Sequence, residues 1–392
     1  MRPSRSCRSA ERWHFNNERN HHMADDQDPL VAGITRLVPE VLRTMEALEI
    51  TQRNMHPSRV PQLAEFIQPF HDSLLQKTDG FADLEFPEHM QAFQDRLAQS
   101  AEYVRRACDG LINHEAGVGN TMRAMRAICR AQETLYPIAA LMSPVNQYFL
   151  EDPLRTDAAL AEQIANGAER AEVGLKHVAN GRDERAGFSL FIPESWDGTS
   201  KLSLVMALHG GTGHGADFIW SWLREARGRG FALIAPTSAQ DTWSLMGEEF
   251  DLERLHEIIT FVSSQYPIDN GHILLTGMSD GGTYSLLAGL REASPFTHLA
   301  PFSGVLHPDI AMHGNLRHAL HRKIYLVHGT VDWMFPIETA YMAQGELESV
   351  GAELTFRPIE GLSHTYARSE NDALLNWFNP ELTLLEPSGE AS

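Results

Sequence analysis

The sequence predicts an α/β protein in which a mainly parallel sheet is preceded by a helical bundle. Two observations lead to this prediction. From about residue 29 to 170, apolar residues recur at three- and four-residue steps, which is the period of helices packed in a bundle. After residue 187, short apolar runs alternate with helix-like segments, a pattern typical of parallel strands joined by helices.

The N-terminal half contains four apolar seams at helical spacing. They run from Ile34 to Leu48, Leu63 to Leu74, Met90 to Leu111 and Met122 to Met142. Proline and glycine residues separate them, so we expect three or four antiparallel helices. The seams are best interpreted as a helical core and not as a cofactor site. Only the fourth, which is rich in methionine, hints at an adaptable binding surface.

Seven strands are expected in the C-terminal half, and each is a short apolar run. They are Phe188 to Ile192, Leu202 to Leu208, Phe231 to Ala235, His272 to Thr276, Leu299 to Phe302, Lys323 to Val327, and Leu354 to Arg357. Helical patterns between them include Leu252 to Val262, Thr283 to Leu290 and Glu338 to Val350. The predicted organisation is a disordered leader (1–28), a helical domain (29–170), a linker (171–186), an α/β domain (187–380) and a flexible tail (381–392).

The charge and composition of the chain argue against nucleic acid and membrane lipid as binding partners. The formal net charge is -20 and no long basic run occurs, which argues against binding to nucleic acid or to anionic lipid. No apolar stretch approaches the roughly 18 residues of a membrane-spanning helix, so no integral membrane association is expected. The three cysteines, Cys7, Cys108 and Cys129, suggest no disulfide framework and favour a reducing, cytoplasmic location.

The first 22 residues contain five arginines but no apolar segment, so they do not form a secretory signal. We expect a disordered extension, explained by translation assigned upstream of Met23. His21 and His22 lie in this leader, and the chain contains neither Cys-x-x-Cys nor His-Glu-x-x-His. No metal site is therefore expected.

The most informative motif is Gly277-Met278-Ser279-Asp280-Gly281. It follows the apolar run His272 to Thr276 directly and precedes a helix-like stretch. A strand that turns abruptly into a helix holds its central residue in a strained conformation and presents the hydroxyl above the sheet. The flanking glycines suit so tight a turn. Ser279 is therefore the candidate nucleophile.

A serine hydroxyl needs a base to take its proton and an acid to orient that base. The run Lys323 to Val327 leads into a loop that contains Asp332, and the last expected strand leads into Gly361-Leu362-Ser363-His364. Both loops follow the carboxyl ends of strands, so they should lie at the same edge of the sheet as Ser279. The three residues together predict a catalytic triad in the order Ser279, Asp332, His364.

Each of the two partners has another interpretation when it is taken alone. Asp332 could cap the helix near Ile337, with Glu338 or Glu360 as the alternative acid. His364 could be a solvated loop residue, since the chain contains 19 histidines.

Attack on a carbonyl creates an oxyanion, which needs two N–H donors. One should come from Asp280, the residue after the nucleophile, at a helix N-terminus. The other should come from the glycine-rich loop His209-Gly210-Gly211-Thr212-Gly213, where Gly211 is our choice. A phosphate cradle is the competing interpretation of this loop, but no Gly-Lys-Ser/Thr follows it.

These motifs make the segment from about 187 to 380 similar to α/β-hydrolase serine esterases. It most resembles the carboxylesterase/phospholipase/thioesterase branch, with its polyester-depolymerase and feruloyl-esterase-like relatives. The resemblance implies hydrolysis through an acyl-enzyme on serine, with neither metal nor organic cofactor. Dienelactone hydrolases share the scaffold but use cysteine where this sequence has Ser279. The helical segment lies outside the resemblance.

Substrate and assembly are less constrained. Trp220 and Trp243 follow strands at the expected site edge, so they could line a pocket for an acyl chain or aromatic acid, or pack the loops against the helical domain. The helical domain could be a cap, a brace or a homo-oligomer interface. The leading hypothesis is a small-molecule esterase for small or medium acyl groups. The alternatives are a thioesterase, an amidase or lysophospholipase-type hydrolase with the same triad, and a non-catalytic scaffold.

Overall fold

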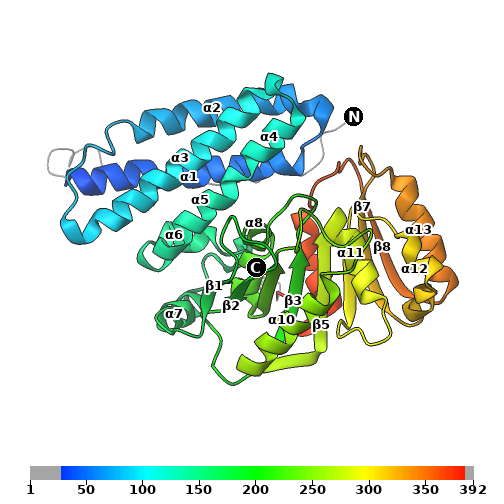
Figure 1. Ribbon diagram of the computed structural model, residues 1–392. Coiled ribbons are helices and arrows are strands. Elements are labelled where there is room, and N and C mark those ends of the chain that lie inside the picture. The colour runs from blue at the N-terminus through cyan, green and yellow to red at the C-terminus, as the bar shows by residue number, and fades with distance from the viewer. Residues whose placement is uncertain (1–27, 385–392) are drawn as a thin grey trace, which may run out of the picture.

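The computed structural model describes residues 28–384, so almost all of the expected leader and most of the expected tail lie outside the described residues. Cys7, His21 and His22 lie outside them as well. The described part contains an N-terminal helical segment and an eight-stranded sheet flanked by helices, as Figure 1 shows. The predicted fold class, an α/β domain with a mainly parallel sheet preceded by helices, is confirmed.

Three long helices dominate the N-terminal segment: α1 (Pro29–Arg53), α2 (Val60–Thr78) and α3 (Gln91–Ile112). They contain the first three predicted seams except Met90, which lies in the 3-10 helix before α3, and they pack beside one another above the sheet in Figure 1. The fourth seam folds differently. It is divided among α4 (Val118–Met125), α5 (Ala127–Leu135), a 3-10 helix (Tyr136–Leu141) and α6 (Ser143–Tyr148), and α7 (Ala158–Gly167) follows. Pro137, which lacks a backbone N–H, explains the change to 3-10 geometry.

The sheet has the strand order β1-β2-β4-β3-β5-β6-β7-β8. Strands β3 to β8 run parallel, whereas β2 pairs antiparallel with both β1 and β4. The bounds are β1 (Gly174–Val178), β2 (Phe188–Ile192), β3 (Leu202–Leu208), β4 (Ala232–Pro236), β5 (Ile268–Met278), β6 (His298–Phe302), β7 (Lys323–Gly329) and β8 (Glu353–Ile359). All seven predicted strands are present.

Strand β1 was not predicted, because residues 171–186 were expected to form a linker. It is an edge strand that contains Lys176 and His177, and it is only partly buried. A short edge strand needs little apolar surface, so its sequence lacks the apolar run that marks the central strands.

Helices cover both faces of the sheet. The remaining helices are α8 (Gly215–Phe218), α9 (Leu223–Arg229), α10 (Leu252–Gln265), α11 (Asp280–Gly289), α12 (Pro308–Met312), α13 (Ile337–Ser349) and α14 (Asn371–Phe378). Side chains of β3 alternate between the two cores, as strand geometry requires. Val205 and Ala207 join a cluster with α9, α14 and the N-terminal bundle, whereas Leu204 and Met206 join one with α10 and α11. The bundle therefore shares a continuous core with one face of the sheet.

Two further observations concern the part of the chain between residues 28 and 384. Cys108 and Cys129 are free thiols. None of the helices in this part is both long enough and apolar enough to cross a membrane.

Candidate active site

Ser279 lies at the turn between β5 and α11 with φ 58° and ψ -118°. This conformation is strained for a residue with a side chain, and it is typical of a nucleophile placed between strand and helix. The glycines around it are required by close packing. A Cβ atom at Gly277 would lie 2.5 Å from the backbone of Gly281, and one at Gly281 would lie 2.4 Å from the carbonyl oxygen of Leu208.

His364 lies between Ser279 and Asp332. Its Nε2 is 2.9 Å from the Oγ of Ser279, and its Nδ1 is 2.8 Å from Oδ2 of Asp332. The three residues are 6–8% exposed. The structure thus brings together the three residues that the sequence predicted as a triad, from loops that follow β5, β7 and β8.

Asp332 is fixed from its other side by the backbone. Its Oδ1 accepts hydrogen bonds of 2.9 Å from the N–H groups of Met334 and Phe335, so it also caps the turn before α13. Burial raises the pKa of Asp332, but the hydrogen bonds from His364 and Phe335 outweigh burial and hold the pKa below its ordinary value. The carboxylate is therefore charged and acts as an acceptor. Glu338 and Glu360, the alternative acids, are both exposed.

His328, which sequence reasoning did not single out, supports this acid. It is fully buried at the end of β7, where its Nε2–H donates a 2.8 Å hydrogen bond to the carbonyl of Phe335. Its Nε2 also lies 3.6 Å from Oδ2 of Asp332. The available signal was its position four residues before Asp332, at the end of a buried strand.

The glycine-rich loop after β3 crosses directly beside the nucleophile. A Cβ atom at Gly210 would lie 3.5 Å from the Cβ of Ser279, and one at Gly211 would lie 2.7 Å from Oδ2 of Asp280. Asp280 is the first residue of α11, and its carboxylate accepts a 2.6 Å hydrogen bond from the hydroxyl of Thr242. The loop and the N-terminus of α11 are thus adjacent, as the predicted pair of oxyanion donors, Gly211 and Asp280, requires.

His209 fixes the start of this loop as a neutral imidazole. Its Nδ1–H donates to the carbonyl of Gly210 at 2.7 Å, and its Nε2 accepts from the N–H of Ser238 at 3.0 Å. Burial lowers the pKa of His209 to about 3. The ring is therefore a structural support for the loop and not a proton carrier at neutral pH.

The two tryptophans proposed as substrate contacts pack inside the protein. Trp243 is 2% exposed, stacks on Tyr284 and donates its indole N–H to the carbonyl of His209 at 2.7 Å. Trp220 is 4% exposed and packs against Tyr136 and Phe149 of the helical segment. Trp220 thus matches the expected alternative of packing against the helical domain, whereas Trp243 packs within the α/β domain, and both leave little surface for a substrate.

Fold and site together define a class of protein. A mainly parallel sheet with a serine between β5 and α11, an acid after β7 and a histidine after β8 is the arrangement of the α/β-hydrolases.

The family comparison agrees with this class. Residues 248–379, about one third of the chain, match the phospholipase/carboxylesterase family, and this segment contains Ser279, Asp332 and His364. This part of the chain is therefore similar to esterases of the α/β-hydrolase fold.

Several solved structures are similar to part of the chain. A thermostable esterase is 20% identical, with a TM-score of 0.36 over 44% of this chain and 50% of its own, so the chain spans half of that enzyme. Esterase PE8 is 20% identical, with a TM-score of 0.39 over 48% of this chain and 97% of its own. The fluorophosphonate-binding serine hydrolase FphF of Staphylococcus aureus is 15% identical, with a TM-score of 0.42 over 54% of this chain and 98% of its own. The class assignment rests on the topology and the family match.

Proposed function

We propose that this protein is a serine hydrolase that cleaves carboxylic esters of small or medium acyl groups through an acyl-enzyme on Ser279. The observation that supports this proposal most directly is the pair of contacts made by His364, 2.9 Å to Ser279 and 2.8 Å to Asp332. A serine with such a base, itself oriented by a charged acid, is activated for attack on a carbonyl carbon.

In the first half of the reaction, Nε2 of His364 takes the proton of Ser279 while Oγ attacks the ester carbonyl. The negative charge moves to the carbonyl oxygen, where the backbone N–H groups of Asp280 and Gly211 stabilise it. His364, now a cation balanced by Asp332, gives its proton to the leaving alkoxide. The bond between carbonyl carbon and alcohol oxygen breaks, the alcohol departs, and the acyl group stays on Ser279.

In the second half, His364 takes a proton from water, and the hydroxide attacks the acyl carbon. The same N–H groups hold the second oxyanion. His364 then returns the proton to Oγ of Ser279, the carboxylic acid leaves and the enzyme is regenerated.

Turnover of p-nitrophenyl esters from C2 to C12 by wild type and by Ser279→Ala tests the proposal. We expect the variant to lose at least about three orders of magnitude in kcat, because residual catalysis without the nucleophile is small. Its circular dichroism should match that of wild type. Near-wild-type turnover by a folded Ser279→Ala variant would refute the assignment.

The type of bond that is cleaved is a separate question. Matched ester, thioester and amide substrates, compared by kcat/KM, distinguish an esterase from a thioesterase or an amidase. We expect the ester to be preferred over the amide, because an alkoxide is a better leaving group than an amide anion. The cytoplasmic location expected from the sequence stays a prediction, and a homo-oligomer interface stays one of the three alternatives for the helical domain.

A further inference from the structure

The helical segment contacts the loop that contains Gly211. Arg126, at the junction of α4 and α5, donates from Nη1 to the carbonyl of Thr212 at 2.8 Å and from Nη2 to the hydroxyl of the same residue at 3.1 Å. Thr212 has φ 54°, in the left-handed region that a branched side chain disfavours. A strained residue needs such contacts to hold it, and this one directly follows Gly211.

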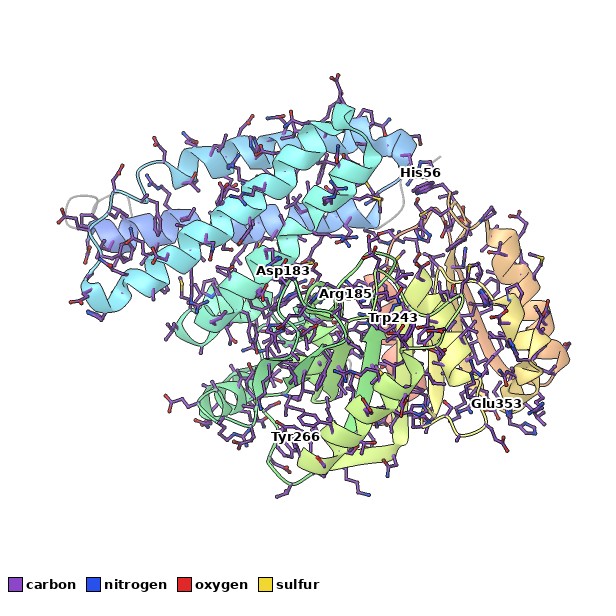
Figure 2. The ribbon with its side chains drawn as sticks, viewed as in Figure 1. His56, Asp183, Arg185, Trp243, Tyr266 and Glu353 are labelled. Atoms are coloured by element: carbon purple, nitrogen blue, oxygen red, sulfur yellow. The ribbon has the colours of Figure 1, made fainter. Side chains whose placement is uncertain are left out.

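The same helical segment contacts the loop that contains His364. The hydroxyl of Thr365 donates a 3.0 Å hydrogen bond to the carbonyl of Gln52, in the last turn of α1. Arg59, which lies three residues after His56, donates from Nη1 to the carbonyl of Gly361 at 3.5 Å. Figure 2 labels His56 at this end of the helical segment. Thr365 is adjacent in sequence to His364, so the contact restrains the residue next to the base.

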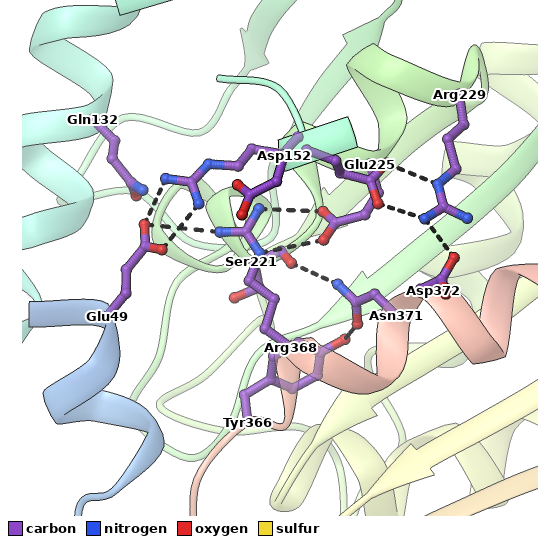
Figure 3. Close-up of polar contacts among 12 residues, drawn as sticks. Glu49, Gln132, Asp152, Ser221, Glu225, Arg229, Tyr366, Arg368, Asn371 and Asp372 are labelled. Atoms are coloured by element: carbon purple, nitrogen blue, oxygen red, sulfur yellow. Dashed lines mark hydrogen bonds and ion pairs between the residues drawn. The ribbon is translucent and has the colours of Figure 1, made fainter. Parts of the chain in front are cut away.

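A third contact is a partly buried group of charges, drawn in Figure 3. Glu49 of α1 accepts two hydrogen bonds from Arg224 of α9, at 2.9 and 2.7 Å. It also lies 4.0 Å from Arg368, which in turn pairs with Glu225 at 3.3 Å. Burial raises the pKa of Glu49, but the charges of Arg224 and Arg368 together with the hydrogen bonds from Arg224 and Tyr148 outweigh burial and leave the pKa below its ordinary value. The ion pairs therefore hold α1 against α9 and against the segment just after His364.

We propose that the helical segment is a fixed part of the active site. In this arrangement Arg126 positions the oxyanion loop, which is the glycine-rich loop of residues 209–213, and the C-terminal turn of α1 positions the loop of residues 361–365 that contains His364. The two loops are bound at separate points of one segment, which shares a core with the sheet. That arrangement suits a rigid wall and not a lid that swings open. Arg126 and Thr365 are positioning residues, because each acts on a reacting group through the backbone.

The inference rests on the proposed function and predicts an effect on rate. Oxyanion donors and the base stabilise the transition state only when they are correctly placed, and small displacements lower kcat while leaving substrate binding almost unchanged. Removal of the Arg126 side chain should therefore lower kcat and leave KM nearly constant. The same applies to loss of the Thr365 hydroxyl.

The experiment compares Arg126→Ala, Arg126→Lys and Thr365→Val with Arg106→Ala as the matched control. Arg106 is an exposed arginine of the same helical segment that pairs with Glu102 on α3. We expect Arg126→Ala to lower kcat about 10-fold with KM within about 2-fold of wild type, and Arg126→Lys to retain part of the rate. Non-denaturing guanidinium ion should restore part of the kcat of Arg126→Ala. Arg106→Ala should resemble wild type.

Several outcomes overturn the inference separately from the proposed function. If Ser279→Ala abolishes turnover while Arg126→Ala and Thr365→Val keep the wild-type kcat, the helical segment does not position the site and the hydrolase assignment stands. If kcat falls only in variants whose melting temperature also falls, and guanidinium ion restores no activity to Arg126→Ala, the residues are merely structural. If Arg126→Ala does not fold, Thr365→Val decides, because it keeps the shape of the side chain and removes only the hydroxyl. If folded wild type hydrolyses none of the esters, thioesters or amides, the proposed function fails as well.

Discussion

Trp243 donates a 2.7 Å hydrogen bond from its indole N–H to the backbone carbonyl of His209. The ring is tilted by 34° relative to that of His209, with 4.8 Å between the centroids, and it is stacked on Tyr284 of α11. This tryptophan therefore connects the start of the oxyanion loop to the helix that follows the nucleophile. These contacts explain the burial of Trp243 at a position where the sequence left open a substrate contact or packing of the loop, and we expect them to hold the two elements in register.

Trp243→Phe tests this role, because phenylalanine keeps an aromatic ring but removes the N–H donor together with part of the ring volume. We expect stability to fall by about 1–3 kcal/mol, since the carbonyl of His209 loses a buried hydrogen bond. The proposed oxyanion donor Gly211 lies two residues further on, so kcat should also fall several-fold. Urea unfolding and steady-state kinetics measure the two effects. A variant whose KM varies less between acyl chains than that of wild type, while kcat is unchanged, would instead indicate that Trp243 contacts the substrate.

Asp332→Asn should lower kcat by about two to four orders of magnitude with little effect on fold. The carbonyl oxygen of asparagine can still accept from Met334 and Phe335, as Oδ1 does now. Its NH₂ group would then face Nδ1 of His364 and favour the tautomer that cannot take the proton of Ser279. Steady-state kinetics on a p-nitrophenyl ester measures this loss.

Glu338→Gln and Glu360→Gln are the matched controls for the acid. Both glutamates are exposed, so their variants should keep wild-type kcat. If Glu338→Gln or Glu360→Gln were inactive and Asp332→Asn active, the acid would be misassigned.

Gly281→Ala should destabilise the protein by at least about 1–3 kcal/mol, the usual cost of forcing an extra methyl into a packed site. Its Cβ would lie 2.4 Å from the carbonyl oxygen of Leu208 and 2.5 Å from that of His209, and backbone cannot move aside cheaply. Gly345→Ala is the control. Gly345 lies inside α13 with open space around it, so alanine should stabilise the helix by about 0.5–1 kcal/mol. Thermal unfolding compares the two, and equal effects would contradict the packing argument.

His298 should make the protein less stable in mild acid. Burial, followed by the positive charge of Lys323, lowers the pKa of His298 from 6.5 to about 4. Between these values the unfolded chain binds a proton that the folded protein does not. Stability is therefore lost as pH falls from about 6.5 to about 4, by roughly 1.4 kcal/mol per pH unit.

Urea unfolding of wild type and His298→Asn at several pH values between 7 and 4 measures this contribution. The variant is expected to be less stable at pH 7, because it loses ring contacts with Trp377 and Phe378. Its stability should nevertheless fall less steeply with acidification. Identical slopes in the two proteins would show that His298 does not titrate in this range.

The strands that the sequence predicted well are those buried on both faces of the sheet. Strand β3 and residues 273–278 of β5 are mostly apolar runs because helices cover both sides of them, and such runs are visible in a sequence. Strand β1 was missed because an edge strand needs no such run. The proximity of Ser279, Asp332 and His364 was predictable because all three follow strands whose ends must meet at one edge.

The remaining features depend on how side chains and segments pack in three dimensions. Sequence placed Trp243 in a loop beside the site, but the direction of its indole ring follows from the packing of Tyr284 and His209. The contact between Arg126 and Thr212 joins residues 86 positions apart, and it exists only because the bundle packs on one face of the sheet. No proline or glycine marks the break between α4 and α5 at Arg126.

The measurement that most directly tests the central claim is labelling with a fluorophosphonate probe, which reacts with an activated serine. Wild type and Ser279→Ala are incubated with the probe, and the modified peptide is identified by mass spectrometry. The account predicts a single adduct on Ser279 in wild type and no adduct in the variant. A folded wild type that is not labelled, or a Ser279→Ala variant that is labelled equally, would contradict it.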